Sequence, residues 1–100
     1  MAKIKHIAFF KFKPGVTDDQ IIQAFDLLME VSESIDGIED YVWGPNTSPE
    51  GLSQGYTHAF VMTFRDAAAR DGYLPHPEHD KFKEAALPLL DGAAVVDFEL

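Results

Sequence analysis

The sequence predicts an α+β fold in which four strands and intervening helices build one antiparallel sheet. Two observations lead to this prediction. Segments with alternating apolar residues lie at both ends of the chain, and a pair of them lies in its middle. Between these segments, apolar residues recur every three or four positions, as they do on one face of an amphipathic helix. The 100 residues suit one domain that spans residues 1–100.

The bulk composition excludes several function classes. Seventeen acidic residues against eight basic ones give a net charge of −9, which opposes binding to nucleic acid and to anionic membrane surfaces. The chain has no cysteine, so a disulfide, a thiol nucleophile and a thiolate metal site are excluded. Lysines interrupt the apolar run near the N-terminus, which fits neither a secretory signal nor a membrane span. We therefore expect a cytoplasmic protein without nucleic-acid or membrane partners.

Residues 3–13 predict the first strand. Their even positions form one nearly apolar row: Ile4, His6, Ala8, Phe10 and Phe12. The odd positions carry lysines at the ends and Ile7 and Phe9 in the middle, so that face is also apolar at its centre. We expect both faces of this strand to be covered, and a homodimer is a reasonable way to cover the second face.

A helix is expected to follow the break at Pro14-Gly15. Thr17 and Gln20 have the spacing of a capping box, and the helix should reach about Ser34. Its predicted buried stripe follows the spacing of one helical face: Ile21, Ile22, Phe25, Leu28 and Met29.

Two further strands are predicted in the middle of the chain, at residues 38–44 and 56–64, where β-favouring aromatic and branched residues gather. The segment 44–55 between them is rich in Gly, Pro, Ser and Asn and predicts a long hairpin connection. One row of the third strand contains His58 among aromatic and apolar residues.

The last third of the chain predicts two helices and a strand. Asp66 is expected to cap a short helix that Gly72 ends. Pro77 suits the first position of another helix, with His76 before it as the cap. The predicted buried stripe of that helix is Phe82, Ala85, Ala86 and Leu89. Pro88 conflicts with a regular helix beyond residue 87.

A turn at Asp91-Gly92 should lead into a final strand at residues 93–100, where Val96 and Phe98 alternate with acidic residues. The resulting order is that of the ferredoxin-like βαββαβ fold. Right-handed crossovers then make the first and third strands central, antiparallel neighbours.

The stretch YLPHPEHDKF, residues 73–82, is the densest group of candidate catalytic side chains in the sequence. It places Tyr73, His76 and His79 within seven residues, at the ends of predicted helices. His6 and His58 lie on the two central strands and would point toward the helices if their rows face the same way. The strand register that decides this does not follow from the sequence.

Four motifs, in this order, resemble the stress-responsive dimeric α/β-barrel family, Dabb: HIAFFKFKPGVT, YVWGPNTSPEG, QGYTHAFVMTF and YLPHPEHDKF. The resemblance covers essentially the whole chain. It implies that two ferredoxin-like sheets close face to face into a dimeric α/β barrel. Most members of this family have no established reaction.

The resemblance also implies a candidate site. A plant polyketide cyclase of the family performs a cofactor-free aldol cyclisation with a Tyr and His pair, and these residues match Tyr73 and His79 here. The remaining pocket histidines resemble His6, His58 and His76, which we predict to bind substrate. The substrate itself does not carry over.

Acid–base chemistry gives these residues their predicted roles. A cofactor-free aldol or lyase reaction needs a base near neutral pH and a donor for the developing oxyanion. His79 is the predicted base, although the helix dipole and its acidic neighbours affect its protonation in opposite directions. The phenol pKa of about 10 suits Tyr73 to hydrogen-bond donation. We predict no metal and no cofactor.

Three alternatives stay open. The chain is also compatible with a non-catalytic dimeric stress or ligand-binding protein, in which the histidines and Tyr73 only pack. Cofactor-free monooxygenases share the barrel architecture, and fold-level analogy is their support. A metal site from His76, His79 and one strand histidine is less favoured, because His76 is expected to lie outside the helix.

Overall fold

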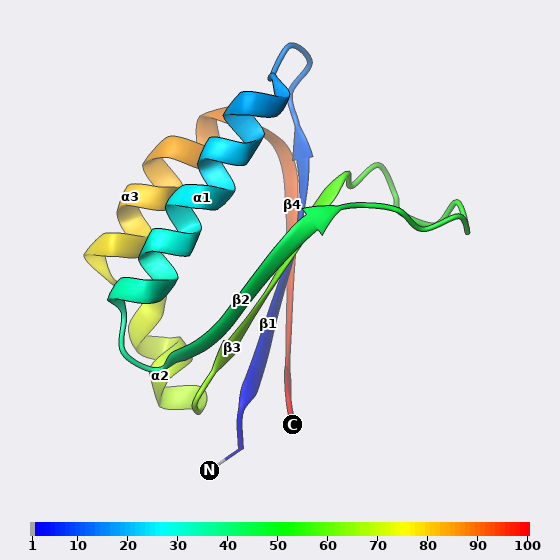
Figure 1. Cartoon of the computed structure of the whole chain (residues 1–100). Coiled ribbons are helices and arrows are strands. Elements are labelled where there is room, and N and C mark those ends of the chain that lie inside the picture. Colours follow the sequence, from blue (N-terminus) through cyan, green and yellow to red (C-terminus); the bar gives the residue numbers. More distant parts are fainter. Residues whose placement is uncertain (1) are drawn as a thin grey trace.

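The computed structural model describes residues 2–100 and has one sheet with helices on a single face (Figure 1). The strands are β1 (Ile4–Phe12), β2 (Ile38–Pro45), β3 (His58–Phe64) and β4 (Leu90–Glu99). The helices are α1 (Asp18–Ser34), α2 (Ala67–Tyr73) and α3 (Pro77–Ala86), followed by the 3-10 turn η1 (Leu87–Leu89).

The four strands are antiparallel in the order β2-β3-β1-β4, so β1 and β3 are central neighbours. This confirms the predicted ferredoxin-like topology. Helices α1 and α3 lie side by side over the sheet, and α2 lies at the end where β3 finishes (Figure 1). The long connection from β2 to β3 projects away from the helical layer.

The predicted capping box at the start of α1 is confirmed. The Thr17 hydroxyl accepts from the Gln20 backbone N–H at 3.2 Å, and Gln20 Oε1 accepts from the Thr17 N–H at 2.9 Å. The predicted stripe was wrong at two positions, because Ile22 and Met29 are 44% and 38% exposed. The buried face is centred on Phe25 and Leu28, and the two exposed residues lie about 70° to 90° around the helix from that centre.

Several predicted boundaries in the last third of the chain need correction. Gly72 does not end α2, which continues through Tyr73, and the Leu74 N–H still bonds the Arg70 carbonyl at 3.3 Å. Asp91-Gly92 is not a turn: β4 starts at Leu90, and the 3-10 turn around Pro88 reverses the chain instead. In α3, Phe82 and Ala86 are buried, whereas Ala85 is exposed.

The caps of the two short helices are confirmed. The Asp66 carboxylate accepts from the Ala69 N–H at 2.9 Å, which starts α2. The His76 side chain accepts from the Glu78 N–H at 3.0 Å, with Pro77 as the first residue of α3. These caps fix where α2 and α3 begin, and residues 74–76 connect the end of α2 to the start of α3.

The strand register gives the sheet two different faces. The even residues of β1 face the helices and pair with the buried row of β3, including His6 with Met62 and Ala8 with Phe60. The opposite face carries one apolar row on each strand: Ile7, Phe9, Val42, Val61, Val96 and Phe98. We call these six residues the open sheet face, because none of the helices of residues 2–100 covers it (Figure 1).

Within residues 2–100, none of the helices combines the length and apolar character that crossing a membrane requires.

Candidate active site

Three of the five predicted site residues come together at one end of the helix–sheet interface. Tyr73 is the last residue of α2, His79 lies in the first turn of α3, and His6 lies on β1. The Tyr73 and His79 rings are nearly parallel with centroids 4.1 Å apart. The His6 ring meets the Tyr73 ring edge-on, with centroids 5.9 Å apart. We call His6, Tyr73 and His79 the tyrosine–histidine cluster.

His58 faces the helices, as His6 does, but lies at the other end of the sheet. It pairs with Phe10, four residues along β1 from His6. Its ring packs edge-on against Phe12, with centroids 5.3 Å apart, and its Nδ1 lies 2.8 Å from the Thr57 hydroxyl. Burial lowers its pKa. The register therefore places His58 away from the cluster.

His76 is near the cluster in sequence but is occupied as a helix cap. Its Nδ1 accepts the Glu78 N–H at 3.0 Å, so this nitrogen is unavailable to a ligand while the cap is formed. Glu78 itself is one of the acidic residues in the first turn of α3.

The Tyr73 hydroxyl is buried without a partner. The side chain is 0% exposed, and its oxygen makes no hydrogen bond to any of residues 2–100. Burial raises the phenol pKa far above its usual range, so the hydroxyl stays protonated. A buried polar group that is left unpaired costs about 1–3 kcal/mol. The fold therefore keeps a hydrogen-bond donor that its own described atoms do not use.

His79 is held in one tautomer. Its Nδ1–H donates to the Leu74 carbonyl at 3.0 Å, because a carbonyl oxygen accepts only. Nε2 of the neutral ring then carries the lone pair. Burial lowers the pKa of this imidazole, helped by Lys83 and His6, whereas the bond to the Leu74 carbonyl opposes the shift. His79 is thus kept neutral at pH 7 with Nε2 as its basic atom.

Two further residues join the cluster through His6. The Asp97 carboxylate on β4 accepts from His6 Nδ1 at 2.7 Å, and its other oxygen accepts from Arg70 of α2 at 3.0 Å. Neither residue was predicted from the sequence. The βαββαβ order places the last strand beside the first, but only the register shows that Asp97 lies opposite His6.

The described residues 2–100 contain no grouping of three or more His, Cys, Asp or Glu side chains that is arranged to hold a metal ion. The described hydrogen bonds of the cluster run to the Leu74 carbonyl and the Asp97 carboxylate. What the cluster offers chemically is a phenol donor beside imidazole bases.

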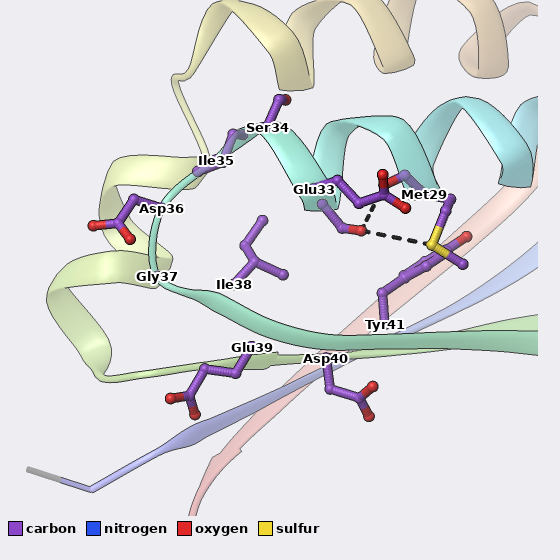
Figure 2. A pocket seen from close by; sticks show the side chains of 11 residues that line it. Met29, Glu33, Ser34, Ile35, Asp36, Gly37, Ile38, Glu39, Asp40 and Tyr41 are labelled. Carbon is purple, nitrogen blue, oxygen red and sulfur yellow. Dashed lines mark hydrogen bonds between the residues drawn. The ribbon is translucent and has the colours of Figure 1, made fainter.

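Four surface depressions of about 340 to 640 Å³ on the described residues are lined by residues outside the cluster. Figure 2 shows one of them, between the end of α1 and the start of β2. Its rim carries Glu33, Asp36, Glu39 and Asp40. The cluster is instead enclosed by aromatic side chains: the Phe64 and Tyr73 ring centroids are 5.2 Å apart, and those of His79 and Phe82 are 6.4 Å apart.

Comparison with known proteins identifies the family. The sequence model of the Stress responsive A/B Barrel Domain, Dabb, matches residues 4–100. The chain is a Dabb protein. Its curated relatives include the Arabidopsis thaliana stress-response A/B barrel domain-containing protein HS1, with 33% identity over 96% of this chain and 88% of the relative. Olivetolic acid cyclase of Cannabis sativa is 25% identical over 95% of this chain and 94% of the cyclase.

Solved structures support the same assignment. The Dabb chain superposes on the Arabidopsis thaliana protein At3g17210 with a TM-score of 0.92 and 33% identity, covering 97% and 94% of the two chains. A dimeric ferredoxin-like protein of unknown function from Thermobifida fusca gives 0.82 at 29% identity, covering 99% and 92%. Hydroxynitrile lyase from Passiflora edulis gives 0.90 at 22% identity, covering 98% and 93%, and shares the fold.

NMR titration of the chain is expected to give His79 a midpoint below the ordinary histidine pKa of about 6.5, because burial disfavours the imidazolium. The sign for stability follows from linkage. Above the ordinary pKa both states are neutral at this residue, and below it the unfolded chain binds the proton first. The free energy of unfolding should therefore decrease as the pH falls through about 6.5.

The matched variant is His79→Gln. Its free energy of unfolding, measured by denaturant titration above and below a pH of about 6.5, should decrease less on acidification than that of the wild type. A His79 midpoint above the ordinary value would contradict the electrostatic description of the site.

Proposed function

We propose that this Dabb protein is a cofactor-independent acid–base enzyme that acts on a small carbonyl-bearing molecule. The observation that carries the proposal is the buried Tyr73 hydroxyl without a partner among the described residues, stacked beside the neutral His79. A donor that is desolvated and unpaired suits a ligand oxygen, because it needs no reorganisation to bind it. The relationship to olivetolic acid cyclase supports cyclase-like or lyase-like chemistry.

The proposed roles follow from the state of each side chain. His79 Nε2 removes a proton from the carbon next to the carbonyl, and the C–H electron pair moves into the enolate. The Tyr73 O–H donates a hydrogen bond to the carbonyl oxygen as negative charge develops there. The raised pKa of Tyr73 keeps its proton on the phenol, so it acts as a donor and not as the first base.

The three histidines predicted to bind substrate lie at different positions and therefore differ in their proposed roles. His6 borders the Tyr73 ring and is retained as a residue that contacts the ligand. His58 pairs with Phe10 at the other end of the sheet, and His76 caps α3, so neither is given a role at this site. The aromatic enclosure of the cluster favours a small substrate.

A non-catalytic dimeric stress or ligand-binding protein is the second candidate. The observation that favours it is the complete burial of Tyr73 and the absence of both Tyr73 and His79 from the four described surface depressions. In this case the cluster packs the end of α2 against the sheet. The experiment below separates the two candidates.

Turnover of a panel of small aldehydes, ketones and polyketide-like esters is expected for the wild type. Tyr73→Phe should reduce the rate about 10²–10³-fold, as removal of one oxyanion donor does. His79→Ala should reduce it by about 10²–10⁴-fold, as loss of a general base does. The rates are measured by steady-state kinetics on each substrate.

Tyr41→Phe is the matched control, because the Tyr41 hydroxyl is also buried but donates to the Phe25 carbonyl at 3.0 Å. It should lose stability and keep the turnover rate. Equal rates for the wild type, Tyr73→Phe and His79→Ala would remove the assigned roles, and no turnover by any of them would favour the non-catalytic candidate.

We also propose that the chain is a homodimer that closes through the open sheet face. The supporting observations are six apolar residues on that face and the exposure of Val96 and Phe98, at 54% and 50%. Burying such a patch removes apolar surface from water, and related proteins from Thermobifida fusca and Jannaschia are described as dimeric. The cytoplasmic location of this dimer stays a prediction from the sequence.

Light scattering at micromolar concentration should give the mass of a dimer for the wild type and of a monomer for Val96→Lys, because a charge buried in the interface would be desolvated. Ile22→Lys is the control, since Ile22 is also exposed but lies on α1 at the other side of the sheet. A monomeric wild type, or a Val96→Lys variant that stays dimeric, would contradict this interface.

A further inference from the structure

We propose that Arg70 and Asp97 are positioning residues that hold His6 as a second acid–base group beside Tyr73. This inference rests on the proposed function, because it names a further group at the same site. It is carried by a continuous chain of contacts from α2 through β4 to β1.

The contact between Asp97 and His6 sets the tautomer of a buried ring. His6 is 6% exposed, and its Nδ1 lies 2.7 Å from Asp97 Oδ1. An ionised carboxylate only accepts hydrogen bonds, so Nδ1 carries the proton and Nε2 of the neutral ring carries the lone pair. The rest of the His6 ring packs among Phe60, Phe64 and Tyr73, with centroid distances of 5.7, 5.9 and 5.9 Å.

Arg70 holds the second oxygen of the same carboxylate. Its guanidinium donates to Asp97 Oδ2 at 3.0 Å, and its Nε donates to Asp71 at 2.8 Å. Charge-assisted contacts of this kind fix the orientation of a carboxylate as well as its charge. With Oδ2 occupied by Arg70, Oδ1 is the oxygen that faces His6.

The position of Arg70 on α2 links the carboxylate to the phenol. Arg70 and Tyr73 are three residues apart in one helix, so their side chains leave the same helical face. The short helix α2 therefore presents the Tyr73 ring and the Arg70 guanidinium that binds Asp97 on the same side. A displacement of α2 would move the phenol donor and, at the same time, remove the Arg70 contact that orients Asp97 toward His6.

His6 and His79 are consequently different bases. His79 Nδ1 is bonded to a neutral carbonyl, whereas His6 Nδ1 is bonded to a carboxylate. When a substrate hydroxyl transfers its proton to His6 Nε2, the O–H bond breaks, an N–H bond forms, and the imidazolium is paired with Asp97. The electron pair on oxygen then forms a carbonyl as the adjacent C–C bond breaks, and the departing enolate takes the proton back from His6, so no further reactant is required.

The test is the tautomer of His6, read by long-range ¹H–¹⁵N NMR of its ring nitrogens in the full chain at mildly basic pH. The wild type should show a protonated Nδ1 and an unprotonated Nε2. Arg70→Gln should give a mixture of both tautomers, and Arg70→Lys should restore most of the single form, because the cation is retained. Arg65→Gln is the matched control: Arg65 pairs with Asp36 at 3.4 Å, and its loss should leave His6 unchanged.

Asp97→Asn provides a second variant with nearly the same shape, and it should also give a mixture, because a side-chain amide both donates and accepts. A single Nδ1-protonated form in Arg70→Gln and in Asp97→Asn would overturn the proposal. The readout needs no substrate, so a failure to find turnover would count against the proposed function alone. Where turnover is found, Arg70→Gln should lower kcat more than it changes KM.

Discussion

The antiparallel pairing of β1 with both of its neighbours is the constraint on which the rest of the structure depends. It turns the even residues of β1 toward the helices and the odd residues toward the open sheet face. The same register places His6 opposite Asp97 on one side and opposite Met62 on the other. A shift by one residue would reverse every one of these positions, so the candidate site and the proposed dimer surface both depend on this pairing.

The helix ends supply the other half of the site. Asp66 starts α2, His76 starts α3, and the bond from His79 Nδ1 to the Leu74 carbonyl at 3.0 Å holds His79 to the residue that follows Tyr73. Their rings stack as a result, with centroids 4.1 Å apart. Backbone geometry thus brings together a donor without a protein partner and a base with a lowered pKa, which is the combination that acid–base chemistry on a carbonyl needs.

Local signals in the sequence predicted the parts of the fold that local chemistry determines. The capping box at Thr17 and the caps at Asp66 and His76 are interactions over two or three residues, so their residue types were sufficient. The strand order followed from chain handedness. The separation of His58 from His6, the start of β4 at Leu90 and the roles of Asp97 and Arg70 depend on register and long-range packing, which residue types do not specify.

The central claim is that the Tyr73 hydroxyl is kept for a ligand oxygen, and infrared difference spectroscopy of bound benzaldehyde labelled with ¹³C at the carbonyl tests it directly. A hydrogen bond from Tyr73 should shift the carbonyl stretch to lower frequency in the wild type and in Tyr41→Phe, and the shift should disappear in Tyr73→Phe. A carbonyl stretch that is the same in all three proteins, or no bound aldehyde at all, would contradict the claim.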